Sequence, residues 1–239
     1  RADLVLVTSP QYKNASNPLQ TFKDKVKILP NAINEKNFIL QQGDEVEIEN
    51  IKEKYSNKKI VFFVGRHIQY KGLPYLVEAE RFIKSDCEII IAGDGPLTDK
   101  LKSACHSSRV HFVGRLDDNE LRWHHYAASI FAFPSITKNE AFGVALAEAM
   151  YCGTPAVTFT IPGSGVNWVS LNNITGLEVS NKDCKAYAGA IDKLLIDDRL
   201  REQFARKSME RVKEHFTIPI MIHLLDSYYK NMFENIYSK

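Results

Sequence analysis

Two glutamates, Glu140 and Glu148, lie eight positions apart in the segment NEAFGVALAEAM, with a Phe-Gly pair and small apolar residues between them. A helix that begins near Gly143 would place Glu140 before its first turn and Glu148 about a turn and a half inside it. The backbone amides of Phe142, Gly143 and Val144 would then be free donors between the two carboxylates. Free amides at a helix N-terminus favour an anion, whereas carboxylates accept hydrogen bonds from hydroxyl groups.

Two cations, Arg66 and Lys71, follow the apolar run 59–65 in the segment VGRHIQYKG. A diphosphate suits this pair, because arginine offers a planar fork and lysine a point charge. Taken singly, each cation or glutamate would more commonly be a solvated surface charge. Together they favour a site for a sugar nucleotide, with the hexose at Glu140, the diphosphate at the helix N-terminus and the ribose at Glu148.

Glycine marks the loops that follow three of the apolar runs, in VGRHIQYKG, IAGDGP and VGRLDD. A glycine there lets the backbone approach a ligand closely. The GDGPL stretch is a near miss of the dinucleotide fingerprint, because Thr98 holds the third glycine position. From these loops we predict that Gly65, Gly93, Gly95 and Pro96 line the nucleotide site.

An alternation of strands and helices would position these residues. We predict buried strands from apolar runs at residues 59–65, 87–93, 109–114, 130–134, 155–159 and 176–179. Helical patterns occur at residues 44–57, 73–85, 143–152, 183–196, 198–214 and 218–236, with further helices beginning at Pro96 and at Asp117 or Asp118. The pattern predicts an α/β fold, a Rossmann-like parallel sheet of about six strands with helices on both faces, and ligands bind such sheets at the carboxyl ends of the strands.

Composition narrows the class of protein. The net charge of +2 over 239 residues argues against a dedicated nucleic-acid binder. No apolar run approaches the roughly 20 residues of a membrane-spanning helix. The four cysteines lack metal-ligand spacing and read as reduced thiols of a cytosolic protein. Because the chain begins without Met, directly on an apolar strand, we expect a piece of a longer protein.

Four segments, VGRHIQYKGLPYLVEA, IAGDGPL, FVGRL and PSITKNEAFGVALAEAMYCGTPAV, resemble in this order the donor-binding half of retaining GT-B glycosyltransferases of family four. The resemblance covers about residues 59–180. Within this family, the sequence is similar to bacterial O-antigen and capsular polysaccharide enzymes. It implies donor-sugar contact by Glu140 and ribose contact by Glu148. It also implies diphosphate contact by Arg66 and Lys71, amide contacts from Phe142, Gly143 and Val144, and base contact near Gly114, Arg115 and Leu116.

The resemblance further implies three parts of the chain. Residues 1–36 would be the end of an acceptor domain and a hinge, residues 37–215 the donor domain, and residues 216–239 a helix that crosses back. The rest of the acceptor domain would be absent from this chain. One departure is that Asn167 or Trp168 stands where many family members carry an acid after a Gly-Gly pair, which leaves the role of that loop open.

The implied reaction transfers a hexosyl or N-acetylhexosaminyl group, preferably from a UDP-sugar, to a hydroxyl of a lipid-linked glycan in O-antigen, lipopolysaccharide or capsule biosynthesis. The resemblance implies no cofactor and no metal ion to hold the diphosphate. The expected partners are the donor, the acceptor glycan and the protein's own acceptor domain, with no nucleic acid. The expected location is the cytoplasm, at the inner face of the bacterial plasma membrane, with peripheral membrane association.

Other functions stay open at this point. The chain could be a non-catalytic module that binds nucleotide sugars, a GDP-mannose-dependent mannosyltransferase or a sugar-nucleotide epimerase of the same fold. An NAD-type oxidoreductase is a further alternative, against which the missing third glycine speaks. Donor turnover, acceptor dependence and a nicotinamide titration would separate these functions.

Overall fold

A parallel sheet of six strands forms the centre of the protein in the computed structural model, which describes residues 2–237 and the side chains as far as residue 234. Its strands are β3 (Lys59–Val64), β4 (Cys87–Ala92), β5 (Val110–Gly114), β6 (Ile130–Phe133), β7 (Ala156–Phe159) and β8 (Gly176–Val179). They lie in the order β5-β4-β3-β6-β7-β8, and every pair is parallel. The predicted fold class is confirmed.

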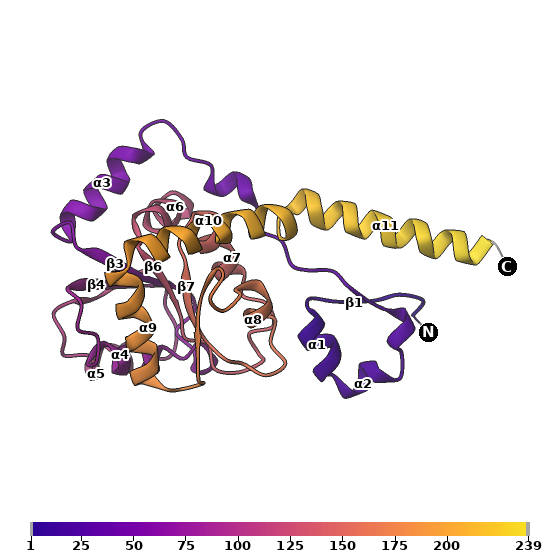
Figure 1. Ribbon diagram of the computed structural model, residues 1–239, viewed down its shortest axis with the longest axis horizontal. Helices are drawn as coiled ribbons and strands as arrows, with labels where there is room; N and C mark the ends of the chain where they lie inside the picture. The colour runs from indigo at the N-terminus through magenta and orange to yellow at the C-terminus, as the bar shows by residue number, and fades with distance from the viewer. Residues whose placement is uncertain (1, 238–239) are drawn as a thin grey trace.

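Helices cover both faces of this sheet (Figure 1). They are α3 (Asp44–Lys54), α4 (Leu73–Glu80), α5 (Thr98–Ala104), α6 (Asp118–Ala127), α7 (Val144–Tyr151), α8 (Val166–Val169), α9 (Cys184–Ile196) and α10 (Asp198–His215). Helix α4 contacts α5 and α9, whereas α6 contacts α3 and α7 contacts α10. The strand order runs outward from β3 in one direction and from β6 in the other. The crevice between these two strands is therefore a topological switch point, where sheets of this type bind ligands.

The central strands are buried on both faces, as their near-continuous apolar runs predict. Phe62 and Phe63 of β3 and Phe131 and Phe133 of β6 have no exposed surface. The ring of Phe131 contacts those of Phe62 and Phe133 at centroid distances of 6.1 and 5.9 Å. This aromatic layer fixes β3 against β6, and so it fixes the loops that leave both strands.

Three helix boundaries differ from the sequence prediction. Helix α4 ends at Glu80, not near residue 85, because the Arg109 guanidinium donates hydrogen bonds to the carbonyls of Glu80 and Ile83 and the chain turns around it. Helix α3 ends at Lys54, not at residue 57, because Ser56 and Asn57 have a left-handed backbone, with φ of 56° and 57°.

The third boundary concerns Pro96, which we expected in the first turn of a helix. Helix α5 begins two residues later, at Thr98. The amide of Gly95 donates to the Asp94 carboxylate at 2.7 Å and to Thr98 Oγ1 at 3.0 Å. These bonds close a separate turn that contains Pro96, so the proline lies ahead of the helix.

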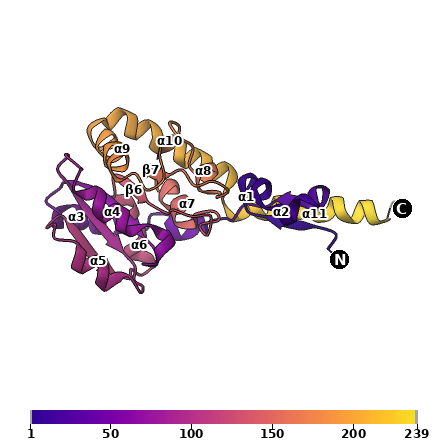
Figure 2. The same cartoon turned by 90° about the horizontal axis from the view of Figure 1, so that it is seen from below.

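A smaller unit lies beside the six-stranded sheet. It contains β1 (Val5–Val7), α1 (Pro10–Ala15), α2 (Asn17–Gln20), a 3₁₀ turn at Lys23–Lys25 and β2 (Val26–Ile28), and β1 pairs in parallel with β2. The long helix α11 (Ile218–Tyr237) runs past this unit in both views (Figures 1 and 2), and Tyr228 donates from its hydroxyl to the Ile28 carbonyl at 2.8 Å. Among residues 2–237, no helix has the length and apolar content that crossing a membrane requires.

The chain passes twice between the small unit and the sheet, and the two crossings touch. The Ile33 amide donates to the Phe216 carbonyl at 2.8 Å, and Ile33 forms a parallel bridge with Thr217. After the first crossing, a 3₁₀ turn at Glu35–Phe38 packs against α6 and α7. The first crossing is therefore held against α6 and α7.

A buried ion pair anchors the first crossing. The Arg122 guanidinium donates to both carboxylate oxygens of Asp44, at 2.8 and 3.0 Å, and the two residues are 3% and 4% exposed. Arg122 also donates to the Asn37 carbonyl at 3.2 Å, and the indole of Trp123 donates to Asp44. The hydrogen bond from Arg122 is the main cause that holds the pKa of Asp44 well below its usual range. This cluster fastens α3 and residues 37–44 to α6.

Removing one partner of this pair should destabilise the fold strongly. We expect Asp44→Ala to lower the free energy of unfolding by about 3–5 kcal/mol, because it leaves the Arg122 charge buried and unpaired. The double variant Asp44→Ala, Arg122→Met should lose clearly less than the sum of the two single variants. Urea unfolding measures these values.

The matched control is the exposed pair of Lys207 and Glu210 on α10, whose charged atoms lie 2.7 Å apart. Alanine at either position should change the free energy of unfolding by less than about 1 kcal/mol. Additive effects of the Asp44 and Arg122 substitutions would contradict the anchoring role.

Candidate functional site

Lys71 and Glu140 meet at the switch point between β3 and β6. Lys71 closes a 3₁₀ turn at Gln69–Lys71 after β3, and Glu140 lies in the loop between β6 and α7. The Lys71 Nζ and Glu140 Oε2 atoms are 2.6 Å apart, and the two side chains are 14% and 10% exposed. Ser135 donates to the same Glu140 oxygen at 3.1 Å. The structure thus brings together two predicted site residues that are far apart in the chain and binds them to each other.

The surroundings of Lys71 are aromatic and tightly packed. Its Nζ lies 5.4 Å from the centroid of the Phe133 ring and 5.7 Å from that of Tyr70, which suits a cation. The next residue, Gly72, has a left-handed backbone, and a Cβ there would lie 1.9 Å from the Pro134 carbonyl oxygen. Only glycine fits between the two loops at this point, and this contact sets the height of Lys71 above the sheet.

The N-terminus of α7 lies between the two glutamates, as predicted. Gly143 is the N-cap, with φ +91°, and the helix begins at Val144, so Glu140 precedes it and Glu148 lies within it. No acceptor among residues 2–237 bonds to the amides of Phe142, Gly143 or Val144. These donors, the Lys71 charge and the helix dipole together favour an anion.

The loop after β7 holds the segment that leads into α7. The Ser164 hydroxyl donates to the Glu140 carbonyl, and the Gly165 amide donates to the Ala141 carbonyl at 2.9 Å. Asn167 braces that loop from within, since it accepts from the Ile161 amide at 2.8 Å and donates to the Phe159 carbonyl at 3.0 Å. Asn167 is one of the two residues at the departure from the family pattern, and its side chain forms hydrogen bonds within its own loop.

Glu148 occupies a different environment from Glu140. It lies one turn into α7, mostly buried, and no hydrogen bond from the described residues stabilises its ionised form. Burial, assisted by the negative charge of Asp118 on α6, raises the pKa of Glu148 to about 7. Burial therefore keeps the Glu148 carboxyl group partly protonated, and so partly neutral, at neutral pH.

A cavity of about 640 Å³ opens at the carboxyl edge of the sheet. Its walls are the loops that follow β3, β4 and β5, and it is lined by Val64, Gly65, Arg66, Gly93, Asp94, Gly95, Pro96, Arg115 and Leu116. Every residue that we predicted for the donor pocket from the glycine-marked loops lies in this lining. Both arginines face a space that is large enough for a small ligand.

Backbone contact between two of these loops shapes the cavity. Gly93 has φ +108°, and a Cβ there would lie 2.0 Å from the Gly65 carbonyl oxygen. We expected the glycines to admit a ligand. At Gly93 the glycine instead admits the neighbouring loop, which holds the cavity walls in place.

His67 ties the same two loops together and was not among the predicted site residues. It is fully buried, and its Nδ1 lies 2.8 Å from Thr98 Oγ1, which donates to Asp94 at 2.8 Å. Because the threonine hydroxyl donates to the carboxylate, His67 Nδ1 is assigned as the donor to Thr98. Hydrogen bonds from Thr98 and the Gly95 amide hold the pKa of Asp94 below its usual range, and burial lowers the pKa of His67.

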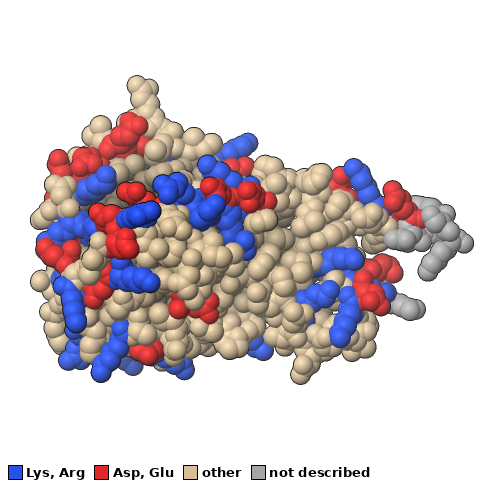
Figure 3. Space-filling view, viewed as in Figure 1, with Lys and Arg blue, Asp and Glu red and all other residues tan. Residues whose placement is uncertain are grey.

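Two further features of the described residues bear on the chemistry. Within residues 2–237, no group of three or more His, Cys, Asp or Glu side chains is arranged to hold a metal ion. Charges of both signs are interspersed over the face of the six-stranded unit that Figure 3 shows. Arg66 and Arg115 line the cavity together with Asp94, and Lys71 is paired with Glu140.

Comparison with known proteins agrees with this geometry. The family described as "Glycosyl transferases group 1" matches residues 44–211. The O-antigen chain mannosyltransferase C of Escherichia coli is 26% identical over 229 residues, which cover 95% of this chain and 59% of that protein. The D-rhamnosyltransferase WbpZ of Pseudomonas aeruginosa is 28% identical over 218 residues, which cover 90% of this chain and 56% of that protein. This chain therefore spans less than two thirds of either relative.

The fold has solved counterparts. A sucrose-phosphate synthase from Thermosynechococcus elongatus superposes with a TM-score of 0.84 at 26% identity, over 98% of this chain and 59% of that one. The Anabaena protein HepE, whose structure contains UDP and glucose, superposes with a TM-score of 0.81 at 19% identity, over 96% of this chain and 63% of that one.

The buried carboxyl group of Glu148 should make stability fall as pH rises. Its folded pKa of about 7 lies above the ordinary glutamate pKa of 4.5, so at a pH between these two values the native state holds a proton that the unfolded state has lost. Between pH 5 and pH 8 the free energy of unfolding of the native protein should fall by about 2.5 kcal/mol, and that of Glu148→Gln should lack this fall.

Urea unfolding at both pH values measures the effect, with Glu202→Gln on the exposed side of α10 as the control. Parallel pH profiles for the native protein and Glu148→Gln would show that Glu148 is not the titrating group.

Proposed function

The chain belongs to the glycosyl transferases group 1 family, and from this premise we propose that it is the nucleotide-sugar-binding part of a retaining GT-B glycosyltransferase. The whole enzyme transfers a hexosyl or N-acetylhexosaminyl group to a hydroxyl of a lipid-linked glycan. One observation carries the proposal. The Lys71–Glu140 ion pair and the free amides of α7 lie at the switch point between β3 and β6, and the cavity with its two arginines opens at the carboxyl ends of β3, β4 and β5 on the same edge of the sheet.

In this proposal the donor lies along the carboxyl edge of the sheet. The base enters the cavity near Arg115 and Leu116, and the ribose hydroxyls donate to Glu148. The diphosphate binds Arg66, Lys71 and the amides of Phe142–Val144. The sugar reaches Glu140 at the far end. The cavity lining and the free amides support this order of contacts.

The chemistry is the exchange of one glycosidic oxygen for another. The bond between the anomeric carbon and the phosphate oxygen breaks, and the acceptor hydroxyl oxygen bonds to the anomeric carbon on the face that the diphosphate leaves. The hydroxyl proton passes to the departing phosphate. Arg66, Lys71 and the α7 N-terminus stabilise the charge that develops on the diphosphate. These groups supply the counter-charge, so we propose that no metal ion or cofactor is needed.

Glu140 orients the sugar in this mechanism and is not a covalent nucleophile. Its carboxylate already binds Lys71 and Ser135, which hold it in one place. A sugar hydroxyl that donates to Glu140 would be held next to the cation that binds the diphosphate. Alignment of the sugar with its leaving group is then a matter of positioning, which can supply much of a rate enhancement.

The acceptor side of the proposal rests on the small unit and α11. We propose that an acceptor domain of the protein's own chain packs on them, because apolar residues of α11 such as Ile222, Tyr229 and Phe233 are 45–56% exposed. A lipid-linked acceptor would bring the whole protein to the cytoplasmic face of the plasma membrane as a peripheral protein. The chain spans only 59% and 56% of its two curated relatives, which leaves room for such a domain.

A second candidate for the donor is GDP-mannose or a related sugar nucleotide. The relatives named above are a mannosyltransferase and a D-rhamnosyltransferase, and rhamnose is the 6-deoxy form of mannose. UDP-sugars remain our first expectation, from the resemblance to polysaccharide enzymes.

A panel of nucleotides tests the function. We expect the 239-residue chain to bind UDP or GDP in calorimetry, with a marked preference for one base, and to bind the matching nucleotide sugar. In the complete protein, donor consumption should depend on an added glycan acceptor. Consumption of a free donor without acceptor would favour an epimerase, nicotinamide binding an oxidoreductase, and binding without any turnover a non-catalytic module.

Replacing Glu140 by Gln should separate binding from transfer. The substitution removes the negative charge that neutralises Lys71, so the affinity for UDP or GDP should rise by up to about 10-fold, or 1.4 kcal/mol. Transfer by the complete protein should fall by about 100-fold or more, because the sugar loses its positioning carboxylate.

Ser135→Ala is the matched control, because it removes one hydrogen bond to Glu140 and keeps the charge. Calorimetry and single-turnover assays give the two quantities. If Glu140→Gln abolished nucleotide binding while turnover per bound donor survived, the assigned role would be wrong.

A further inference from the structure

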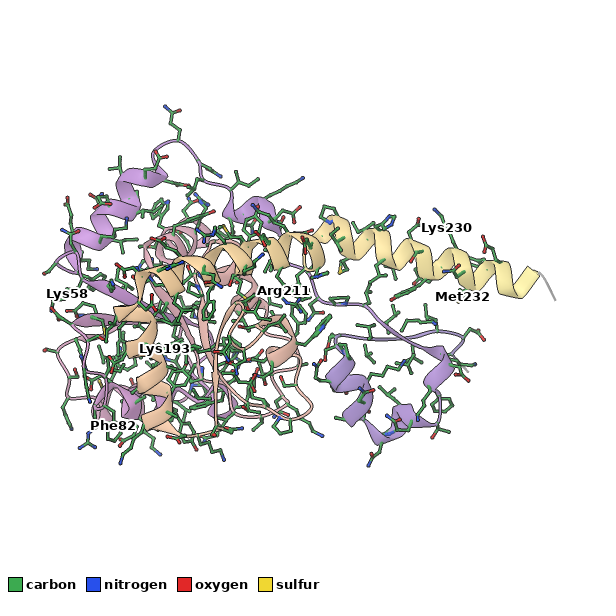
Figure 4. The ribbon with its side chains drawn as sticks, in the orientation of Figure 1. Lys58, Phe82, Lys193, Arg211, Lys230 and Met232 are labelled. Carbon is green, nitrogen blue, oxygen red and sulfur yellow. The ribbon has the colours of Figure 1, made fainter. Side chains whose placement is uncertain are left out.

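Phe216 lies at the point where α10 ends and the chain crosses to α11. It has no exposed surface, and its carbonyl accepts the hydrogen bond from the Ile33 amide of the other crossing. The residue is therefore part of the junction between the six-stranded sheet and the small unit. Figure 4 labels Arg211 one turn earlier, near this junction.

The ring of Phe216 touches the wall of the proposed diphosphate site. Its centroid lies 5.3 Å from that of Phe142, edge to face at 86°, and 5.3 Å from that of Trp168. The Arg211 guanidinium lies 5.4 Å from the Phe216 centroid and donates to the Val169 carbonyl at 2.9 Å and to the Trp168 carbonyl. Edge-to-face packing fixes the relative orientation of two rings as well as their distance.

Phe142 carries the first of the free amides before α7. The residue after it, Gly143, rests on the sheet, since a Cβ there would lie 3.2 Å from the Phe133 ring. The turn at Phe142–Val144 is thus held from the sheet by Phe133 and from the junction by Phe216. No side chain other than Trp168 and Phe216 makes a ring contact with Phe142 within the described residues.

We propose that Phe216 is a positioning residue for the donor diphosphate, acting through Phe142. The inference rests on the proposed function. Loss of the Phe216 ring leaves Phe142 free to tilt, and the amides that should meet the phosphates lose their common direction. A shift of such groups by about 1 Å is enough to weaken a bound state greatly. The interdomain junction thereby sets the shape of the phosphate site directly.

The positioning role of Phe216 is tested by measuring how much the second phosphate of a nucleotide contributes to binding. We would measure the dissociation constants of UMP and UDP, and of GMP and GDP, for the native chain, Phe216→Leu and Phe204→Leu. Phe204 is equally buried on α10, and no ring contact among the described residues joins it to Phe142. Both substitutions remove the same atoms from the core, so general destabilisation affects them alike, and chemical denaturation verifies that both variants fold.

We expect the ratio of monophosphate to diphosphate dissociation constants to fall about 10-fold in Phe216→Leu and to change less than about 2-fold in Phe204→Leu. An equal fall in both variants, or no fall in either, would overturn the positioning role. If the native chain binds none of these nucleotides, the proposed function fails and the inference with it.

Trp168 gives an independent readout. The chain has two tryptophans, so a Trp123→Phe background leaves Trp168 as the single emitter, and chemical denaturation verifies that this background folds without the hydrogen bond from Trp123 to Asp44. Saturation with UDP or GDP, whichever binds, should change Trp168 emission in this background and should change it by less than half as much once Phe216→Leu is added. An unaltered response would show that the junction does not sense the phosphate site.

Discussion

The site depends on how closely the backbones of neighbouring loops approach at the carboxyl edge of the sheet. Parallel strands β3 and β4 end side by side, and the loops that leave them come so near that a side chain on Gly93 would strike the Gly65 carbonyl. This contact fixes the spacing of Arg66 and Asp94 on the cavity wall. The same constraint recurs between β3 and β6, where Gly72 fits against Pro134 and sets Lys71 within reach of Glu140.

The periodicity of the sequence predicted the six strands of the central sheet and the longer helices, whereas α1, α2 and α8 have no counterpart in the sequence prediction. Strands β3 and β6 are continuous apolar runs, and the start of α7 at Val144 follows from Gly143 and the small residues after it. Periodicity could not predict the Lys71–Glu140 contact, because the alternation of strands and helices does not determine which strands become neighbours. The order β3-β6 creates that contact, and it emerges only from the packed sheet.

Residues that support the site were harder to find than those that line it. His67, Ser164 and Phe216 each act through a hydrogen bond or ring contact to a segment distant in the chain. A single buried histidine, serine or phenylalanine has no pattern that distinguishes it from ordinary core. A charged residue in a glycine-flanked loop does, which is why Arg66 was predicted, whereas Arg115 came from the family resemblance and the supporting residues were not predicted.

The touching crossings have a consequence for how such a protein can be rearranged. Residues 34–215 leave and rejoin the small unit at neighbouring points, because Ile33 and Phe216 share a hydrogen bond of 2.8 Å. A segment whose two ends meet can be transplanted as a cassette without stretching the chain on either side. Recombination at these two points would exchange the six-stranded unit while keeping the small unit and α11 intact. The hydrogen bond between the crossings thus marks the two points at which this unit can be exchanged.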